Sequence, residues 1–234
     1  MRHETPAPPE LGIHHGLAYA LFVPEGEPIG GVVILHGAGS CKESHFDFAR
    51  AARVYGLAAL AFDARGHGSS EGVFGDGAID DVHSICDVLA ARAPRLALRG
   101  SSMGGFCAIN AAAADERVAA VVAICPAPED LLLRALRSEE RELEFEVDQA
   151  AAERWLERTS LSDAAAALSP RAALLLMHAR EDEQIPYTVS EELHAVAGEP
   201  KRLIVVPGGH HRSIQHDGEL QGESLRFLTR ALRG

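Results

Sequence analysis

Short runs of apolar residues recur along the chain, and most of them are followed by a stretch with helical spacing. The runs at 31–35 and 57–62 contain no charged residue, and those at 95–99, 117–125, 172–178 and 201–206 are mainly apolar. Uninterrupted apolar runs of this length are typical of strands that are buried on both faces, as in a parallel sheet. Residues 17–23 alternate weakly and predict an earlier, partly exposed strand.

Apolar residues spaced three and four apart predict helices between these strands. In segment 78–91, Ile79, Val82, Ile85 and Leu89 fall on one helical face. Spacing or composition also predicts helices at 42–55, 106–114, 187–197 and 219–232. Alternating strands and helices favour an α/β class, with one domain over 1–234 and a mostly parallel central sheet flanked by helices on both faces.

Two segments depart from this alternation. Residues 1–12 are Pro-rich and polar at their start, and they predict a loose N-terminal tail. Residues 126–170 are charged and helical in composition, and they predict two or three short helices, around 129–137, 148–158 and 162–168. This helical insertion after the sixth strand is either a small lid or a solvated pair of surface helices.

Composition narrows the classes of partner. Hydrophobic residues make up 47% and charged residues 24% of the chain, as in ordinary globular proteins. The formal net charge of -12 disfavours nucleic acids and anionic membranes as partners, because both attract positive surfaces. Neither a membrane span nor an apolar leader segment is predicted, so the expected location is cytoplasmic.

The cysteines give no sign of a metal site. Cys41, Cys86, Cys107 and Cys125 form no CxxC pair, and reduced, mostly buried thiols are expected. A phosphate-binding GxxxxGK[ST] motif is absent from the sequence. No metal and no cofactor are therefore expected.

A Gly-x-Ser-x-Gly motif at 100–104 stands between a predicted strand and a predicted helix. That context is required of a nucleophile elbow, in which a serine occupies a sharp, strained turn. Gly100 and Gly104 remove side chains where strand and helix approach closely. The start of the helix offers free backbone N–H groups to a developing oxyanion. Ser102 is therefore the candidate nucleophile.

A serine hydroxyl needs a base within hydrogen-bonding reach, and the base needs a group that orients it. Carboxylates follow the strand at 172–178, in Glu181-Asp182-Glu183, and histidines follow the strand at 201–206, in His210-His211. In an open α/β sheet, chemistry gathers outside the carboxyl ends of the strands. These residues can therefore converge on Ser102.

Taken together and in order, these blocks resemble the α/β-hydrolase superfamily, in its small serine esterase and serine-aminopeptidase-like branch. The blocks are His36-Gly37-Ala38-Gly39, the Gly-rich stretch 63–70, the elbow, the stretch 178–186 and Gly208-Gly209-His210-His211. The resemblance implies an α/β-hydrolase fold. It places Asp182 at the acid position, ahead of Glu181 and Glu183, and favours His211 over His210 as the base.

The same resemblance implies an oxyanion hole made by the backbone N–H groups of Ala38 and Met103. It gives His36 and the stretch 63–70 structural roles. The expected activity is that of a serine hydrolase that cleaves carboxylic esters of small molecules through an acyl-enzyme intermediate. A thioesterase, a small peptidase and a non-catalytic binding module on a hydrolase fold are the alternatives.

The substrate pocket is expected to involve Phe74, the 126–170 segment and the loop after His36. Because the insertion is short, an open site that favours small or short-chain substrates is expected. The oligomeric state cannot be predicted from the sequence.

Overall fold

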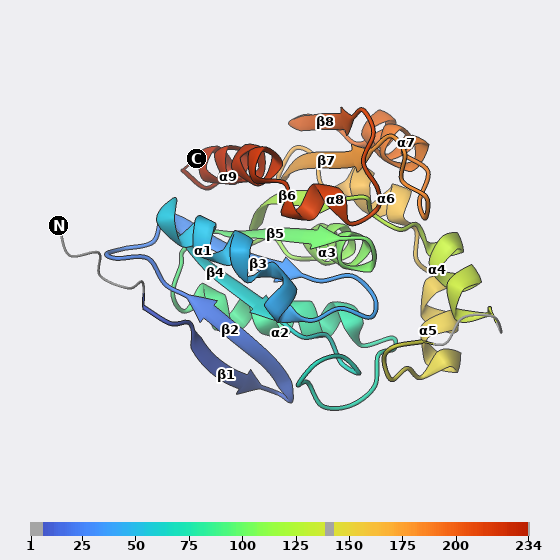
Figure 1. Ribbon diagram of the computed structural model, residues 1–234, viewed down its shortest axis with the longest axis horizontal. Helices are drawn as coiled ribbons and strands as arrows, with labels where there is room; N and C mark the ends of the chain where they lie inside the picture. Colours follow the sequence, from blue (N-terminus) through green and yellow to red (C-terminus); the bar gives the residue numbers. More distant parts are fainter. Residues whose placement is uncertain (1–6, 139–142, 234) are drawn as a thin grey trace.

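An eight-stranded sheet runs through the middle of the molecule in the order β1-β2-β4-β3-β5-β6-β7-β8, with helices on both faces (Figure 1). The structure is a computed structural model that describes residues 7–138 and 143–233. The strands are β1 (Glu10–His14), β2 (Leu17–Phe22), β3 (Gly30–Leu35), β4 (Leu57–Phe62), β5 (Leu96–Ser101), β6 (Val118–Ile124), β7 (Ala173–Ala179) and β8 (Lys201–Val206).

Helices alternate with these strands along most of the chain. They are η1 (Lys42–His45), α1 (Phe46–Val54), α2 (Ala78–Ala90), α3 (Met103–Ala114), α4 (Glu129–Leu136), α5 (Gln149–Leu156), α6 (Leu161–Ala167), α7 (Thr188–Val196), α8 (Ser213–His216) and α9 (Gly218–Arg233). Strands β3 to β8 pair in parallel, whereas β1 and β2 join the edge in antiparallel fashion. The predicted mostly parallel α/β fold is confirmed.

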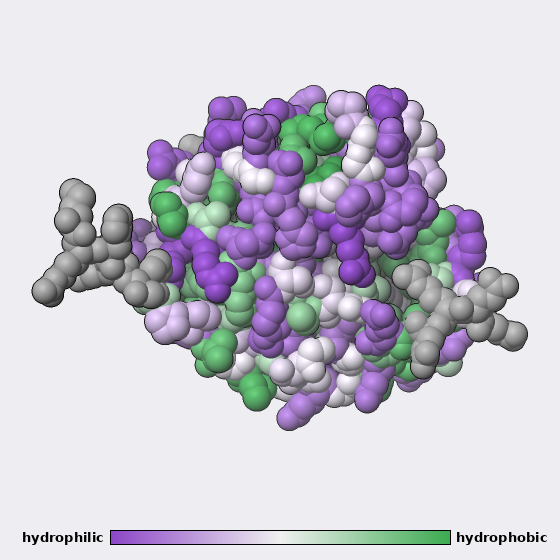
Figure 2. All heavy atoms as spheres, viewed as in Figure 1, coloured by the Kyte–Doolittle hydropathy of each residue, from purple (hydrophilic) through white to green (hydrophobic). Residues whose placement is uncertain are grey.

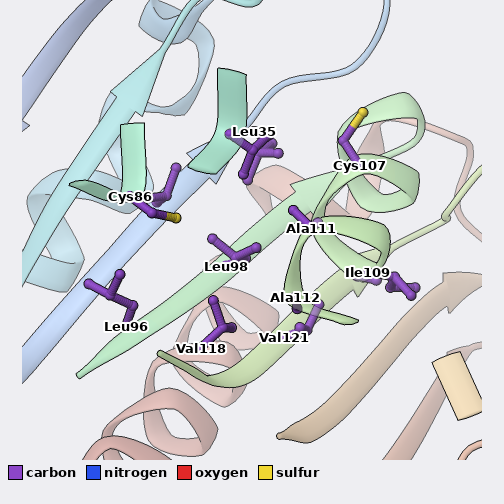
Figure 3. Packing of buried hydrophobic residues seen from close by; sticks show 14 of the residues in the cluster. Leu35, Cys86, Leu96, Leu98, Cys107, Ile109, Ala111, Ala112, Val118 and Val121 are labelled. Carbon is purple, nitrogen blue, oxygen red and sulfur yellow. The ribbon is translucent and has the colours of Figure 1, made fainter. Parts of the chain in front are cut away.

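The sheet has an apolar layer on each face, because successive residues of a strand point to opposite sides. Helices α2, α3, α6 and α7 pack on one face and α1 and α9 on the other. Figure 3 shows part of the first layer, where Leu98 of β5 and Val121 of β6 lie with Ala111 of α3. The uninterrupted apolar runs predicted as strands are therefore covered on both sides.

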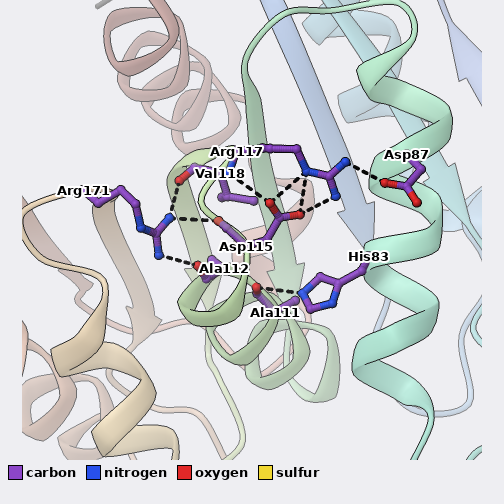
Figure 4. A network of polar contacts seen from close by, with 8 residues as sticks. All are labelled: His83, Asp87, Ala111, Ala112, Asp115, Arg117, Val118 and Arg171. Atoms are coloured by element: carbon purple, nitrogen blue, oxygen red, sulfur yellow. Dashed lines mark hydrogen bonds and ion pairs between the residues drawn. The ribbon is translucent and has the colours of Figure 1, made fainter.

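A polar network fixes the end of α3 that is remote from the elbow (Figure 4). Arg171, just before β7, donates to the carbonyl oxygens of Ala112, Asp115 and Val118 at 2.7, 2.9 and 3.0 Å. Arg117 donates to the carboxylate of Asp115. The last carbonyls of a helix lack partners within the helix. Arg171 supplies donors to this end and connects it to the start of β7.

The prediction of a loose tail over 1–12 is wrong for residues 10–12. Glu10–His14 forms β1, an edge strand paired with β2. Leu11 and Ile13 point outward and are 73% and 68% exposed. The apolar residues of this strand therefore do not mark a buried face, and the sequence pattern indicates the strand only weakly. Residues 1–6 lie outside the described residues.

The insertion lies between β6 and β7, after the sixth strand as predicted, and contains α4, α5 and α6. Helix α8, only four residues long, was not predicted. Among the helices of 7–138 and 143–233, none combines the length and apolar character needed to cross a bilayer. The face drawn in Figure 2 is mainly hydrophilic, and its apolar patches are small and separate.

Candidate active site

Ser102 occupies a strained turn between β5 and α3. Its φ of 53° and ψ of -120° are unusual for a residue with a side chain. A Cβ on Gly100 would overlap the carbonyl oxygen of Gly104, and a Cβ on Gly104 would overlap that of Leu35. Only glycine fits at these two positions. The N–H of Ser102 also donates to Ile124 O on β6 at 2.9 Å, so backbone contacts fix the turn from several sides.

Asp182 and His211 form a hydrogen-bonded pair at the carboxyl ends of β7 and β8. Nδ1 of His211 lies 2.8 Å from Oδ2 of Asp182, and the side chains are 8% and 0% exposed. Because a carboxylate only accepts, Nδ1 carries the proton, which leaves Nε2 of His211 free to accept one. The pair thus has the tautomer that a general base requires.

The carboxyl group of Asp182 is stabilised in its charged form. Burial opposes ionisation, but hydrogen bonds from His178 and His211, and from the N–H groups of Ile185 and Gln184, outweigh it. Together they hold the pKa of Asp182 well below its usual range. The group beside His211 is therefore a carboxylate at neutral pH.

Ser102 and His211 line one cavity of about 250 Å³. Ala38, Gln215 and His216 also line it. No hydrogen bond joins the Ser102 hydroxyl to His211 within the described residues. Such contacts are often long in the absence of substrate and tighten only in the reacting complex.

The alternative acid and base residues lie differently. His210 is exposed, does not line this cavity, and bonds through its backbone to Ser213. Glu181 and Glu183 are exposed. Glu183 has a role that the sequence did not indicate, because its Oε2 accepts from the backbone N–H of His211 at 3.1 Å. Its carboxylate contacts the backbone of His211 and not the imidazole.

The two candidate oxyanion donors lie beside the elbow. Ala38 lines the Ser102 cavity, and Met103 is the first residue of α3. In residues 7–138 and 143–233, neither N–H donates to a protein acceptor. Gly37 brings the Ala38 loop close, since a Cβ there would lie 3.4 Å from Cβ of Ser102.

Buried polar groups support this loop from below. His36 accepts from the N–H of Ala64 through Nε2 at 3.0 Å and contacts Gly37 O through Nδ1 at 2.8 Å. Burial lowers the pKa of His36 to about 4, so the ring is neutral. Nearby, Asp63 accepts from both the backbone N–H and Nζ of Lys42, each at 2.7 Å. These contacts agree with the structural roles expected of His36 and of stretch 63–70.

Arg99 is a residue that the sequence analysis missed. It lies on β5 three positions before Ser102, is 1% exposed, and stacks 3.9 Å from the ring centroid of Phe48. Its Nη2 donates to Gln215 O on α8 at 3.0 Å. Burial lowers the pKa of Arg99 to about 10, so the side chain is still cationic at neutral pH. An arginine inside an otherwise apolar strand was the signal that could have identified it.

One group of possible metal ligands occurs among the described residues. Ligand atoms of Cys125, His178 and Asp182 lie within 4.8 Å of one another. The protein already occupies two of them, since Asp182 accepts from His211 and the ring nitrogens of His178 contact Ser190 Oγ and Ile185 O at 2.7 and 3.0 Å. This group is therefore accounted for by hydrogen bonds within the chain.

A second cavity, of about 340 Å³, adjoins the first. Ala38, Leu132, Ala135 and Arg212 line both cavities. The second one is also lined by Gly39, Phe74, Met103, Leu136, Leu143, Glu144, Phe145, Trp155 and Leu156. Phe74, the insertion and the loop after His36 contribute to this wall, as the sequence analysis expected of a pocket.

Comparisons with known proteins agree with this fold. The uncharacterized protein YfhR of Escherichia coli K12 is 27% identical over 219 residues, which cover 89% of this chain and 73% of YfhR. The α/β hydrolase GrgF of Penicillium sp. sh18 superposes with a TM-score of 0.78 at 19% identity, covering 96% of this chain and 98% of GrgF. The monoacylglycerol lipase of Paleococcus ferrophilus superposes with a TM-score of 0.71 at 22% identity, covering 93% of this chain and 98% of the lipase.

The family described as serine aminopeptidase, S33, matches residues 26–144, just over half of the chain. The matched segment contains the Ala38 loop and the elbow, whereas Asp182 and His211 lie beyond it. The chain therefore belongs to the serine aminopeptidase S33 family of α/β-hydrolases.

Proposed function

We propose that the protein is a serine hydrolase that cleaves carboxylic esters of small molecules through an acyl-enzyme. Ser102 is the nucleophile, His211 the general base and Asp182 the group that orients His211. The observation that carries the proposal is the 2.8 Å pair of His211 and Asp182 in a structure where His211 and the elbow serine line one cavity. Membership in a hydrolase family supports the same reaction class.

Acylation follows from the positions of these groups. Nε2 of His211 takes the hydroxyl proton of Ser102 as Oγ attacks the ester carbonyl. The N–H groups of Ala38 and Met103 hold the oxyanion of the tetrahedral intermediate, and each such donor is worth about 10²–10³ in kcat. The protonated His211 then gives its proton to the leaving alcohol.

Deacylation repeats these steps with water in place of Ser102. His211 removes a proton from water, the hydroxide attacks the acyl carbon, and Ser102 leaves with the proton. Asp182 stays ionised throughout, which stabilises the imidazolium formed in each half-reaction. The low pKa of Asp182 supports this role.

The test combines an active-site label with ester turnover. A fluorophosphonate probe should add one label at Ser102, detectable by peptide mass spectrometry. Turnover of p-nitrophenyl acetate and butyrate should fall by at least about 10⁴-fold in Ser102→Ala and in His211→Ala. His210→Ala is the matched control, since its ring does not line the cavity, and its turnover should stay within about threefold of wild type.

Two results would overturn the proposal. Turnover retained by folded Ser102→Ala protein would exclude Ser102 as the nucleophile. A wild-type protein that neither takes the probe nor cleaves any ester would favour the non-catalytic binding module. Acyl-CoA and peptide substrates, assayed beside the alkyl esters, separate a thioesterase or a small peptidase from an esterase.

A further inference from the structure

A cavity of about 340 Å³, which we call the aromatic pocket, adjoins the cavity that Ser102 and His211 line. The pocket is defined by Phe74, Met103, Leu132, Leu136, Phe145 and Trp155. We infer that it binds the acyl group of the substrate, and that the preferred substrates are esters of uncharged, apolar acids of medium chain length or with an aryl ring. This inference rests on the proposed function.

The location of His211 decides between acyl group and alcohol. The leaving alcohol must lie at His211, because that imidazole protonates it. His211, Gln215 and His216 line the 250 Å³ cavity and not the aromatic pocket. The aromatic pocket instead begins at Ala38 and Met103, the candidate oxyanion donors. A carbonyl oxygen held there directs the alcohol toward His211 and leaves the aromatic pocket for the acyl chain.

The lining of the pocket selects apolar groups. Its aromatic rings brace one another edge to face, with Trp155 centred 6.1 Å from Phe74 and 5.5 Å from Phe106. Phe145 lies 6.0 Å from Phe74 and stacks on His67 at 4.2 Å. Interlocked rings present a large apolar surface with few alternative conformations.

The pocket is lined by charged side chains of both signs. Glu144 and Arg212 are the charged side chains that line the pocket in the described part of the chain. The carboxylate of Glu144 approaches the Ala38 loop, because a Cβ on Gly39 would lie 2.9 Å from its Oε2. Because the two charges are opposite, selection against an acyl chain with a second carboxylate comes from the apolar lining, where a carboxylate would lose its hydration.

Backbone hydrogen bonds fix the outer wall before substrate arrives. The N–H of Phe74 donates to Glu146 O at 2.9 Å, and the N–H of Asp148 returns a bond to Phe74 O at 2.9 Å. The N–H of Glu146 donates to Gly66 O at 3.0 Å. A preformed wall lowers the ordering cost of binding. The volume of about 340 Å³ behind this wall favours longer acyl chains than the short ones expected from the sequence.

A panel of p-nitrophenyl esters tests the inference. It contains acetate, butyrate, hexanoate, octanoate, 3-phenylpropanoate and the half-ester of glutarate. In wild type, kcat/KM should rise about fourfold per added methylene, the factor that corresponds to about 0.8 kcal/mol per buried CH₂. Octanoate, with six more methylenes, should exceed acetate by about 10³-fold or more, and 3-phenylpropanoate by about 50-fold or more. The anionic glutarate should be the poorest of the longer substrates.

Leu136→Trp should weaken this preference. Leu136 lines the aromatic pocket and not the Ser102 cavity, so the larger ring occupies acyl space. The ratio of kcat/KM for octanoate to that for acetate should fall at least about tenfold in protein whose circular dichroism matches wild type. Arg134→Trp is the matched control, because it adds the same ring to the exposed side of α4, and it should keep the wild-type ratio.

The outcomes separate this inference from the proposed function. Labelling of Ser102 with a flat or falling chain-length profile would overturn the acyl pocket and leave the esterase standing. A rising profile that Leu136→Trp leaves unchanged, in protein whose acetate turnover shows it folded, would place the acyl chain elsewhere. Failure of both labelling and turnover would overturn the function itself. Since wild-type enzyme supplies the profile, poor folding of Leu136→Trp alone cannot decide the question.

Discussion

The elbow and the loop that carries His211 are held in place by different means. At the elbow, Gly100 and Gly104 touch neighbouring backbone so closely that no side chain fits. The base loop, residues 207–216, instead depends on separate hydrogen bonds. Asp182, Glu183 and the Ser213 hydroxyl accept from it, and Arg99 donates to it. Backbone packing fails as a unit, whereas hydrogen bonds can be removed one at a time. Changes at the two elbow glycines should therefore act on folding, and changes to the hydrogen bonds of the base loop on kcat.

Among the residues that hold His211 in place, Asp182 should matter most for activity, and Asp182→Asn tests this. An amide can donate to Nδ1 of His211, which favours the wrong tautomer and leaves Nε2 protonated. We expect kcat for p-nitrophenyl butyrate to fall about 10⁴-fold with the fold retained, measured beside circular dichroism. Glu183→Gln is the matched control and should lose far less, since Glu183 contacts only the backbone N–H of His211. Equal losses in both variants would contradict the assignment of the acid.

Gly100→Ala should act on stability instead. The new methyl group would overlap Gly104 O, so strand and helix would have to separate. We expect the free energy of unfolding, measured in urea, to fall by about 3 kcal/mol or more. Gly218→Ala is the control, because a Cβ there has no atom within 4 Å, and should change it by less than about 0.5 kcal/mol. A tolerated Gly100→Ala would disprove the claim that packing fixes the elbow.

Acid should weaken the layer beneath the base loop. Burial, with Arg99 close by, lowers the pKa of His45 to about 3, and its ring stacks on His216 of α8. Below pH 6.5 the unfolded chain takes up a proton at His45 that the folded protein refuses, so stability falls with falling pH. His45 alone should lower the free energy of unfolding by about 2 kcal/mol between pH 7 and pH 5.

Urea titrations of wild type and His45→Phe at the two pH values measure this contribution. On acidification from pH 7 to 5, the free energy of unfolding of the variant should fall by about 2 kcal/mol less than that of wild type. An identical loss in both proteins would mean that His45 is protonated in the folded state.

Arg99→Met should have the smallest effect. It removes one donor to Gln215 O, which keeps a second from Gln221 Nε2 at 3.0 Å. We expect kcat to fall about tenfold from slight misplacement of His211, with KM unchanged. The melting temperature should change little, because the buried Nε and Nη1 of Arg99, which have no partner among the described residues, are removed as well. Arg99→Lys should restore part of kcat; a drop in stability with normal kcat would contradict a positioning role.

The sequence was most informative where burial is strongest. The run that became β4 was predicted with the same ends, because a strand covered on both faces needs unbroken apolar residues. Strand β8 was also predicted with the same ends, although its residues are only partly buried. The elbow helix was predicted from 106 but begins at Met103. Its first turn contains Gly104 and Gly105, and glycine has a low helix propensity, so the sequence does not indicate a helix there. Strand β1 was not predicted, because its apolar residues Leu11 and Ile13 face outward.

Other features depend on contacts between distant segments. Phe74, Phe145 and Trp155 meet in three dimensions, and no periodicity in the chain relates them. The hydrogen bond from Arg99 to Gln215 spans 116 positions. For the residues proposed to act, order along the chain and family resemblance indicated Ser102, Asp182 and His211. The contacts of Glu183 with His211 and of Arg99 with Gln215 join residues that no sequence pattern connects, so only the structure identified them.

The bridge between Phe74 and Val147 bears on how variants of this protein can be constructed. It joins two segments more than seventy positions apart, and a Cβ on Gly66 would overlap the carbonyl oxygen of Glu146, so the two backbones fit against each other closely. In a chimera that takes only the helical insertion from a relative, the segment around Val147 would pair with a segment around Phe74 that did not evolve with it. Transplants should therefore exchange both segments as a matched pair, and in natural relatives we expect the two to diverge in step.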